Sequence, residues 1–522
     1  MNLLKAVYTV SGMTLVSRVT GLVRESLKAA VFGAGPAMDA FEAAFRLPNL
    51  LRRLFAEGAF SQAFVPILAD VRRTRGAAET RDLVSRVASL LAVVLVAVTA
   101  VGLVASPWLV YLLAGAFARD PSKSGLATEL VRIVFPYILF ISLTSLAGGV
   151  LNVHRRFAIP AFTPVLLNLA MIAATLFVAP HVDPPIVALA WGVAIGGALQ
   201  LGLQIRPLVK LGMLPRPTLD WRHPDVRRVL VAMGPALLGV SAAQISILIN
   251  TQLAAWLGDG RIAWIAYADR LMEFPTALLG VALGTVLLPT LARHAGDGDE
   301  ARYSALLDWG LRLALLLALP AAVALWLLAL PLVSTLYQYG RFGAVDALAT
   351  RAALLGYAVG LAGIVAVKIL APGFYARTDL RTPVRVAFAT VLVSQSLAFL
   401  LMHPLGHAGL TLATSIGALF NATVLWVLLR RSGGYTPRPG WPRFLLRVLV
   451  AAALLAAVLA LGAGPASLWL NATLFERVGR LAVLVAAGAA AYFGALALLG
   501  FRVSDFSRRD AGPMPPPPLD DD

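Results

Sequence analysis

Long apolar runs recur from one end of this 522-residue chain to the other, and they constrain its fold more than any other feature. About 20 apolar residues in an α-helix are enough to cross the hydrocarbon core of a bilayer. Because runs of that length alternate with short polar or Pro/Gly-rich segments, we predict fourteen membrane-spanning helices. The predicted spans are residues 5–32, 38–68, 87–113, 131–152, 160–180, 186–205, 231–256, 268–291, 311–334, 352–373, 384–402, 409–429, 444–463 and 481–500.

The composition excludes most other classes of protein. Hydrophobic residues make up 59% of the chain and charged residues only 14%, whereas a soluble domain has roughly 45–50% and about 25%. Water-soluble enzymes, disordered chains and fibrous repeats are therefore poor interpretations. The chain has no cysteine, which excludes disulfides, thiolate-bound metals and thiol nucleophiles. The sequence predicts an all-α, polytopic membrane protein.

The loop charges predict how the spans are oriented. With the N-terminus inside, the predicted inner segments carry 27 Lys and Arg residues and the predicted outer segments carry 7. An excess of Lys and Arg marks the cytoplasmic side of a membrane protein. Both termini are thus expected in the cytoplasm, and the first apolar run, which lacks a clear cleavage site, is expected to stay as a helix. This topology accounts for most of the net charge of +17, so no nucleic-acid partner is expected.

A weak internal repeat suggests two lobes. The segment that begins Phe64-Val-Pro-Ile-Leu-Ala resembles the segment that begins Leu287-Leu-Pro-Thr-Leu-Ala. Six spans separate the two segments, so the halves would have the same orientation, as in transporters built from parallel repeats. The alternative is chance similarity among Leu/Ala-rich helices. We expect an N-terminal lobe of six helices (1–210), a C-terminal lobe of six (225–432), two extra helices (440–502) and a disordered Pro-rich tail (510–522).

Ten basic residues lie outside the loop segments. Lys5 and Arg132 are near helix ends, and six of the other eight fall within the first two spans. A charge facing lipid at mid-membrane costs about 2.5–3.5 kcal/mol on insertion scales, so these side chains must face protein or water. An α-helix turns 100° per residue, and on that geometry the basic residues and their acidic neighbours form one charged stripe on each of three spans. The stripes are Arg18, Arg24, Glu25 and Lys28 on the first span; Asp39, Glu42, Arg46, Arg52, Arg53 and Glu57 on the second; and Asp269, Arg270 and Glu273 on the eighth.

We interpret the three stripes as the lining of one central, water-filled cavity. Arginine suits bidentate contact with phosphate oxygens, so the basic surplus points to an anionic substrate such as a phosphate or diphosphate. The alternative is a set of inter-helix salt bridges that only stabilise the bundle. It applies most to Glu42–Arg46 and Arg53–Glu57, whose i,i+4 spacing allows them to pair along one helix.

The sequence offers no catalytic motif. There is no Gly-Lys dipeptide and hence no phosphate-binding loop for ATP, and no His-Glu-x-x-His metal motif. His403 and His407 are four residues apart, but Pro404 and Gly406 between them indicate a turn and not a metal site. We therefore expect a transporter and not an enzyme, with no cofactor.

Several motifs resemble the MurJ (MviN-type) lipid II flippase family, within the multidrug/oligosaccharidyl-lipid/polysaccharide exporter superfamily. They are Ser17-Arg-Val-Thr-Gly-Leu-Val-Arg24, the run from Phe45 to Pro66 that contains Pro-Asn-Leu-Leu-Arg-Arg-Leu-Phe-Ala-Glu-Gly-Ala-Phe-Ser-Gln-Ala-Phe-Val-Pro, Tyr267-Ala-Asp-Arg-Leu-Met-Glu-Phe-Pro275, Gly280-Val-Ala-Leu-Gly-Thr and Ala371-Pro-Gly-Phe-Tyr-Ala-Arg377. The likeness extends to about residue 509, and the long run around Arg52 is highly specific.

The resemblance implies more than the residues alone do. It implies a flippase of the bacterial cytoplasmic membrane, moving undecaprenyl-diphosphate-linked GlcNAc–MurNAc-pentapeptide to the outer leaflet by alternating access. It also implies that the two extra helices (440–502) form a groove for the lipid tail, with Arg447 at its start as a further candidate. Some family members carry a sodium site, whose ligands cannot be assigned in this sequence, so a coupling cation stays open. The residues that match the family's functional cavity charges are Arg18, Arg24, Asp39, Arg52, Glu57 and Arg270, with Asp269, Glu273 and Arg53 as further lining residues.

The expected partners are lipid II, membrane lipids and the cell-wall synthesis machinery, around a monomer. Three other interpretations remain open. One is a related exporter of a drug or of another polyprenyl-linked sugar, which an apolar or acidic first hairpin would favour. A membrane glycosyltransferase should carry an acidic motif in an outer loop. A structural scaffold for the cell-wall machinery would not need buried charge.

Overall fold

The computed structural model describes residues 3–52 and 59–501, and every regular element in those ranges is a helix. This confirms the prediction of an all-α membrane protein. Arg53, Glu57 and the tail 510–522 lie outside the described residues. Helices are the expected solution for a chain in lipid, because a helix satisfies its own backbone hydrogen bonds where water is absent.

The chain divides into two compact units. Unit 1 contains Met1–Leu271, Leu332–Tyr357 and Arg381–Gly417, and unit 2 contains Met272–Pro331, Ala358–Leu380 and Ala418–Asp522. The helices of unit 1 are α1 (Leu3–Phe32), α2 (Pro36–Leu51), α3 (Ala59–Val104), α4 (Ser106–Ala114), η2 (Gly115–Arg119), α5 (Pro121–Val134), α6 (Tyr137–Val153), α7 (Ala158–Ala173), η3 (Ala174–Val178), η4 (Ala179–His181), α8 (Ile186–Lys210), α9 (Pro224–Trp256) and α14 (Arg381–Leu405).

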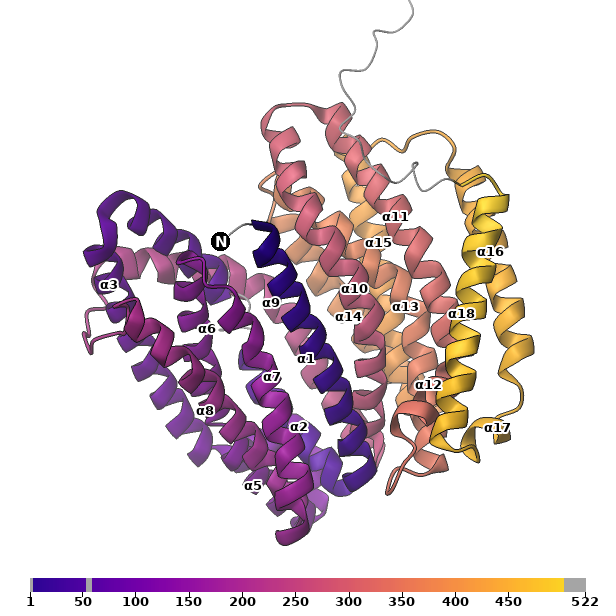
Figure 1. Ribbon diagram of the computed structural model, residues 1–522, viewed down its shortest axis with the longest axis horizontal. Coiled ribbons are helices and arrows are strands. Elements are labelled where there is room, and N and C mark those ends of the chain that lie inside the picture. Colours follow the sequence, from indigo (N-terminus) through magenta and orange to yellow (C-terminus); the bar gives the residue numbers. More distant parts are fainter. Residues whose placement is uncertain (1–2, 53–58, 502–522) are drawn as a thin grey trace, which may run out of the picture. The chain divides into compact units, whose positions relative to one another are not determined.

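Unit 2 is built on fewer helices, and four helices contribute residues to both units. The helices of unit 2 alone are α11 (Glu300–Leu327), α16 (Trp441–Ala463), α17 (Ser467–Leu470) and α18 (Leu474–Leu498). The shared helices are α10 (Arg261–Gly296), α12 (Ala329–Tyr337), α13 (Ala344–Ala376) and α15 (His407–Arg431). Within unit 2, α18 packs along α16, and α16 packs on α11 (Figure 1). The division into two repeat lobes and two extra helices stays a prediction.

Ten helical segments of the described chain are long and apolar enough to cross a membrane. They overlap ten of the predicted spans, although the predicted spans 87–113 and 311–334 extend beyond the ends of the observed segments. The other four predicted spans fall on α1, α2 with the start of α3, α9 and α10. Large apolar side chains are widely exposed on these helices, as at Leu461 (87% exposed) and Leu498 (91%). Surfaces of this kind are stable against lipid and not against water, so the chain is a multi-pass membrane protein.

Glycines let α8 approach its neighbours closely within unit 1. A Cβ at Gly192 would lie 2.9 Å from the Cβ of Ala174, and a Cβ at Gly197 would lie 2.6 Å from the Tyr137 ring. Helices in lipid gain no hydrophobic drive from packing together, so they associate through close backbone contact at small residues. The sequence Gly192-Val-Ala-Ile-Gly-Gly197 is thus the contact face of α8 toward η3 and α6.

The predicted inner segment 69–86 is mostly helical, which differs from the loop expected from its charges. It belongs to α3, which is interrupted only at Gly76, where φ is 84°. Such a φ favours glycine because it lacks a Cβ. Charged residues continue the helix beyond this break, as in the i,i+4 pair between Arg86 and Asp82 (2.6 Å).

Candidate functional site

Arg24 on α1 is the first residue of a buried ionic site in unit 1. Its side chain is 11% exposed, and its Nη1 donates a hydrogen bond to Oδ1 of Asn168 on α7 (2.8 Å). The Asn168 amide in turn donates to the Ser17 carbonyl (3.0 Å) and to the Thr20 hydroxyl (3.1 Å). Because Asn168 binds α1 at three points, it fixes where the Arg24 guanidinium lies.

Glu25, the next residue of α1, joins three cations. Its carboxylate contacts Arg24, lies 2.5 Å from Lys28 Nζ and lies 3.6 Å from Nε of Arg270 on α10. The Glu25 side chain is only 5% exposed. A carboxylate in such a place is stabilised by its cations, and they are stabilised by it, because each charge alone would be costly to bury.

Lys28 extends the site to α2. Its Nζ lies 2.5 Å from Oε1 of Glu42, and it also lies over the Tyr267 ring at 5.2 Å from the centroid. Tyr267 is itself held by donating to the Gly33 carbonyl (3.1 Å). One lysine therefore ties together α1, α2 and α10 at the point where all three carry charges.

We call this arrangement the buried charge cluster, and it carries one more cation than anions. Its members are Arg24, Glu25, Lys28, Glu42 and Arg270. Arg270 is its most accessible cation, with a side chain 31% exposed. Groups of this kind can hold an anion by exchange of ion-pair partners, since guanidinium groups bind phosphate as readily as carboxylate. The cluster contains no nucleophile paired with a base.

Asp39, a predicted cavity residue, occupies a different place. Its carboxylate accepts hydrogen bonds from the main-chain N–H groups of Gly260 (2.6 Å) and Ala263 (2.9 Å), at the start of α10. Lys123 Nζ lies 3.7 Å away. The first amides of a helix have no partner within the helix and carry partial positive charge, so a buried carboxylate there acts as a cap.

The remaining predicted residues lie on α1, at the end of α2 and on α10. Arg18 is exposed on α1, and Arg52 donates from Nε (3.0 Å) and Nη2 (2.8 Å) to Asn49 Oδ1, just beyond α2. Asp269 and Glu273 are half-buried on α10, on either side of Arg270. Arg53 and Glu57 lie outside the described residues. Of the predicted residues, the structure thus brings Arg24 and Arg270 together around Glu25.

Three residues of the cluster were predicted only as members of the charged stripes. Glu25, Lys28 and Glu42 lie on the predicted stripes, but the resemblance did not assign them a role. The suggested pair Glu42–Arg46 is not formed, because Glu42 binds Lys28 instead. Asn168 could have been found from the sequence, because a lone amide side chain in an apolar span usually faces another helix.

The fold is similar to those of solved membrane proteins. It is similar to a solved structure described as an inward-facing conformation of a multidrug resistance MATE family transporter of the MOP superfamily, with a TM-score of 0.69 at 15% identity over 82% of this chain and 98% of the other. A second solved structure, described as lipid II flippase MurJ in an inward closed conformation, matches with a TM-score of 0.80 at 23% identity, covering 94% and 98%. These likenesses define the fold, a polytopic bundle of membrane helices.

The sequence comparisons identify the family. A family model described as "Lipid II flippase MurJ" matches residues 28–478. A relative from Burkholderia cenocepacia, named lipid II flippase MurJ, is 50% identical over 98% of this chain and 100% of its own length. A relative from Vibrio cholerae, named probable lipid II flippase MurJ, is 38% identical over 97% of each chain. This chain belongs to the MurJ lipid II flippase family, as its motifs predicted.

Proposed function

We propose that this protein is a lipid II flippase, which moves the undecaprenyl-diphosphate-linked peptidoglycan precursor from the inner to the outer leaflet of the bacterial cytoplasmic membrane. The observation that carries the proposal is the 50% identity, over essentially the whole of both chains, to a relative with that name. The buried charge cluster supports it, because a diphosphate is the part of the substrate that needs a cationic site inside the membrane.

We assign the cluster the task of binding that diphosphate. Arg24 and Arg270 would contact its oxygens, with Arg24 held in position by Asn168 and Lys28 adding charge from the α2 side. Glu25 holds these cations in the empty protein. When the diphosphate arrives, the cations exchange one anionic partner for another, so the protein never exposes unpaired charges to a dry interior.

Transport follows an alternating-access cycle in this proposal. The protein works as a monomer with both termini in the cytoplasm, in line with the excess of Lys and Arg on the predicted inner segments. It uses no resident cofactor, and a coupling cation has no assigned ligands. The cell-wall synthesis machinery supplies and removes the substrate, and Asp39 keeps the start of α10 in place during the cycle.

The test is a flipping assay with fluorescent lipid II in proteoliposomes, combined with complementation of cells depleted of their own flippase. Arg24→Ala and Arg270→Ala should abolish both activities while the protein still inserts. Arg293→Ala, an exposed arginine near the end of α10, is the matched control and should stay active. Normal flipping by either cluster variant would contradict the proposed site. Flipping of a different polyprenyl-linked sugar in place of lipid II would favour the related-exporter alternative.

A further inference from the structure

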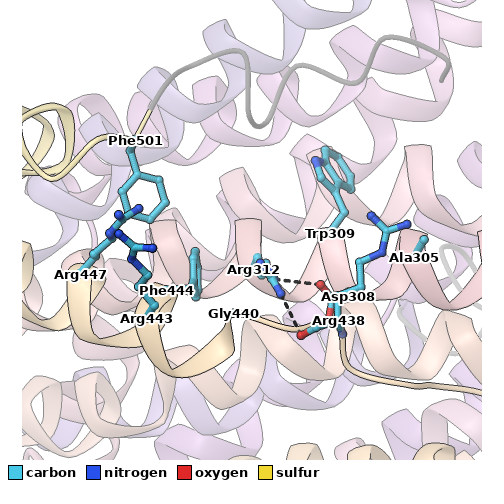
Figure 2. A pocket seen from close by; sticks show the side chains of 10 residues that line it. All are labelled: Ala305, Asp308, Trp309, Arg312, Arg438, Gly440, Arg443, Phe444, Arg447 and Phe501. Carbon is cyan, nitrogen blue, oxygen red and sulfur yellow. Dashed lines mark hydrogen bonds and ion pairs between the residues drawn. The ribbon is translucent and has the colours of Figure 1, made fainter. Parts of the chain in front are cut away.

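A pocket of about 340 Å³ in unit 2 is separate from the buried charge cluster. It lies where α11 and α16 meet the loop 432–440 and Phe501, close to the ends of two membrane spans (Figure 2). Four arginines line it, one from α11, one from the loop and two from α16: Arg312, Arg438, Arg443 and Arg447. Asp308 is the one carboxylate among its lining residues. We call it the arginine pocket.

Asp308 and Arg312 already have partners within the protein. Asp308 is 2% exposed and accepts hydrogen bonds from the Tyr435 hydroxyl (2.8 Å) and Trp441 Nε1 (2.7 Å). It also forms an ion pair with Arg312, whose Nε lies 2.8 Å from the carboxylate. Arg312 also donates from Nη2 to the carbonyls of Arg438 (3.2 Å) and Pro439 (3.1 Å). This pair therefore holds the loop and the start of α16, and its charges cancel.

The other three arginines leave the pocket strongly positive. Within residues 3–52 and 59–501, Arg438, Arg443 and Arg447 form no ion pair. Arg443 and Arg447 are one turn apart on α16, so their side chains lie on the same face, next to the Phe501 ring (Figure 2). The Arg447 guanidinium lies 5.7 Å from the centroid of that ring. Three cations around one cavity, with no ion-pair partner among the residues that the structure describes, favour a ligand with negative charge.

The surroundings point to a lipid as the source of that charge. Exposed apolar residues lie beside the two arginines on α16: Leu446 is 63% exposed and Leu449 is 55% exposed. Arg443 and Arg447 lie within the first two turns of α16, Arg447 about 9 Å along the helix from Trp441 at 1.5 Å per residue. The first turns of a membrane-spanning helix are where basic side chains reach lipid headgroups. Aromatic rings flank the cations, as they commonly do at a membrane interface.

We propose that the arginine pocket binds the phosphate of an anionic phospholipid, with its acyl chains along the apolar flank of α16. Arg443 and Arg447 contact the phosphate oxygens, and Arg438 neutralises the rest of the headgroup from the loop. Guanidinium groups suit this role because they present paired N–H donors to phosphate. Basic pockets beside membrane helices recognise lipid headgroups by the same chemistry. The site is independent of the proposed flippase activity.

The test measures lipid bound to the purified full-length protein by native mass spectrometry, with phosphatidylglycerol and phosphatidylcholine as probes. The wild type should retain phosphatidylglycerol in preference to phosphatidylcholine. Arg443→Gln/Arg447→Gln should reduce phosphatidylglycerol binding about tenfold or more, since each basic residue near a membrane surface adds about 1 kcal/mol. Arg430→Gln/Arg431→Gln removes the same charge from exposed positions at the end of α15 and should leave binding unchanged.

Three results would overturn the proposal. The first is unchanged phosphatidylglycerol binding by the pocket variant. The second is an equal loss in both double variants, which would indicate general surface charge. The third is full displacement of the lipid by excess inorganic phosphate, which would identify a site for the free ion. If the double variant unfolds, Arg438→Gln in the loop provides the same test without touching a helix, and its unchanged melting in detergent shows that it is folded.

Discussion

The carboxylate of Asp39 on α2 accepts a hydrogen bond from the main-chain N–H of Ala263 on α10, at 2.9 Å. The two residues are 224 positions apart in the sequence. The first turn of one helix therefore caps the start of another, and a residue that looks like a cavity charge also holds the fold together. The residues of the buried charge cluster likewise stabilise the fold and form the proposed binding site.

Removing the Asp39 cap should destabilise the protein. Asp39→Ala leaves two buried amides at the start of α10 without an acceptor, and we expect a loss of about 1–3 kcal/mol. Thermal unfolding in detergent checks this as a lower Tm. Asp259→Ala is the control, because the Asp259 side chain is 61% exposed and pairs with the same Lys123. It should change the stability by less than about 1 kcal/mol. Equal Tm values for the two variants would count against the capping role.

The pair between Lys28 and Glu42 should show strong coupling. Lys28→Met leaves the Glu42 carboxylate buried without its cation and should cost about 3–5 kcal/mol. Glu42→Gln should cost less, because Lys28 keeps its ion pair with Glu25. The double variant should lose less than the sum of the two, with a coupling energy of about 1–3 kcal/mol. Unfolding free energies of the four proteins of this double-mutant cycle, measured by denaturant titration in mixed micelles, give the value. Additive losses would show that the two side chains do not interact.

Asn168 should affect transport through the position of Arg24. Asn168→Ala removes an acceptor for a charged donor, an interaction of about 1.5–3 kcal/mol. We expect lipid II flipping in proteoliposomes to fall about tenfold, with insertion unchanged. Asn471→Ala, at an exposed position after α17, is the control and should flip at the wild-type rate. An Asn168→Ala variant with full activity would remove Asn168 from the positioning role.

The glycine face of α8 should tolerate no side chain. Gly192→Ala places a methyl group 2.9 Å from the Cβ of Ala174 and 3.1 Å from the Met171 backbone, so α8 and α7 must separate. We expect a loss of about 1–3 kcal/mol from overpacking. Gly202→Ala on the same helix has no neighbour within 4 Å and should be neutral or slightly stabilising, because alanine favours helix. Tm values in detergent separate the two outcomes.

The charged stripes show how far the sequence could predict the site. Helical periodicity placed Arg24, Glu25 and Lys28 on one face of α1, and the cost of burying charge required partners on other helices. Which partners they would be was not predictable, because Glu42 had an equally plausible neighbour in Arg46 on its own helix. The choice depends on how α1, α2 and α10 pack, and that information is distributed over many apolar contacts.

The arginine pocket shows a second limit of sequence reasoning. Arg438, Arg443 and Arg447 were counted as charges of a predicted inner loop, where solvated arginines are usual. Asp308 is what distinguishes them, because it binds Arg312, Tyr435 and Trp441 and so folds the loop into the wall of a cavity. A carboxylate more than 120 residues earlier in the chain gives no local sign of this role.

Glu25 also bears on what the protein can do when it carries nothing. If the cationic side chains of a carrier had no counter-ion once the substrate had left, another anion would have to bind them during the return step. The protein would then work as an exchanger. Glu25 stays in the protein as a permanent counter-ion for Arg24, Lys28 and Arg270. In the proposed cycle we therefore expect the empty form to reset by itself, so that net movement of cargo in one direction needs no compensating anion in the other.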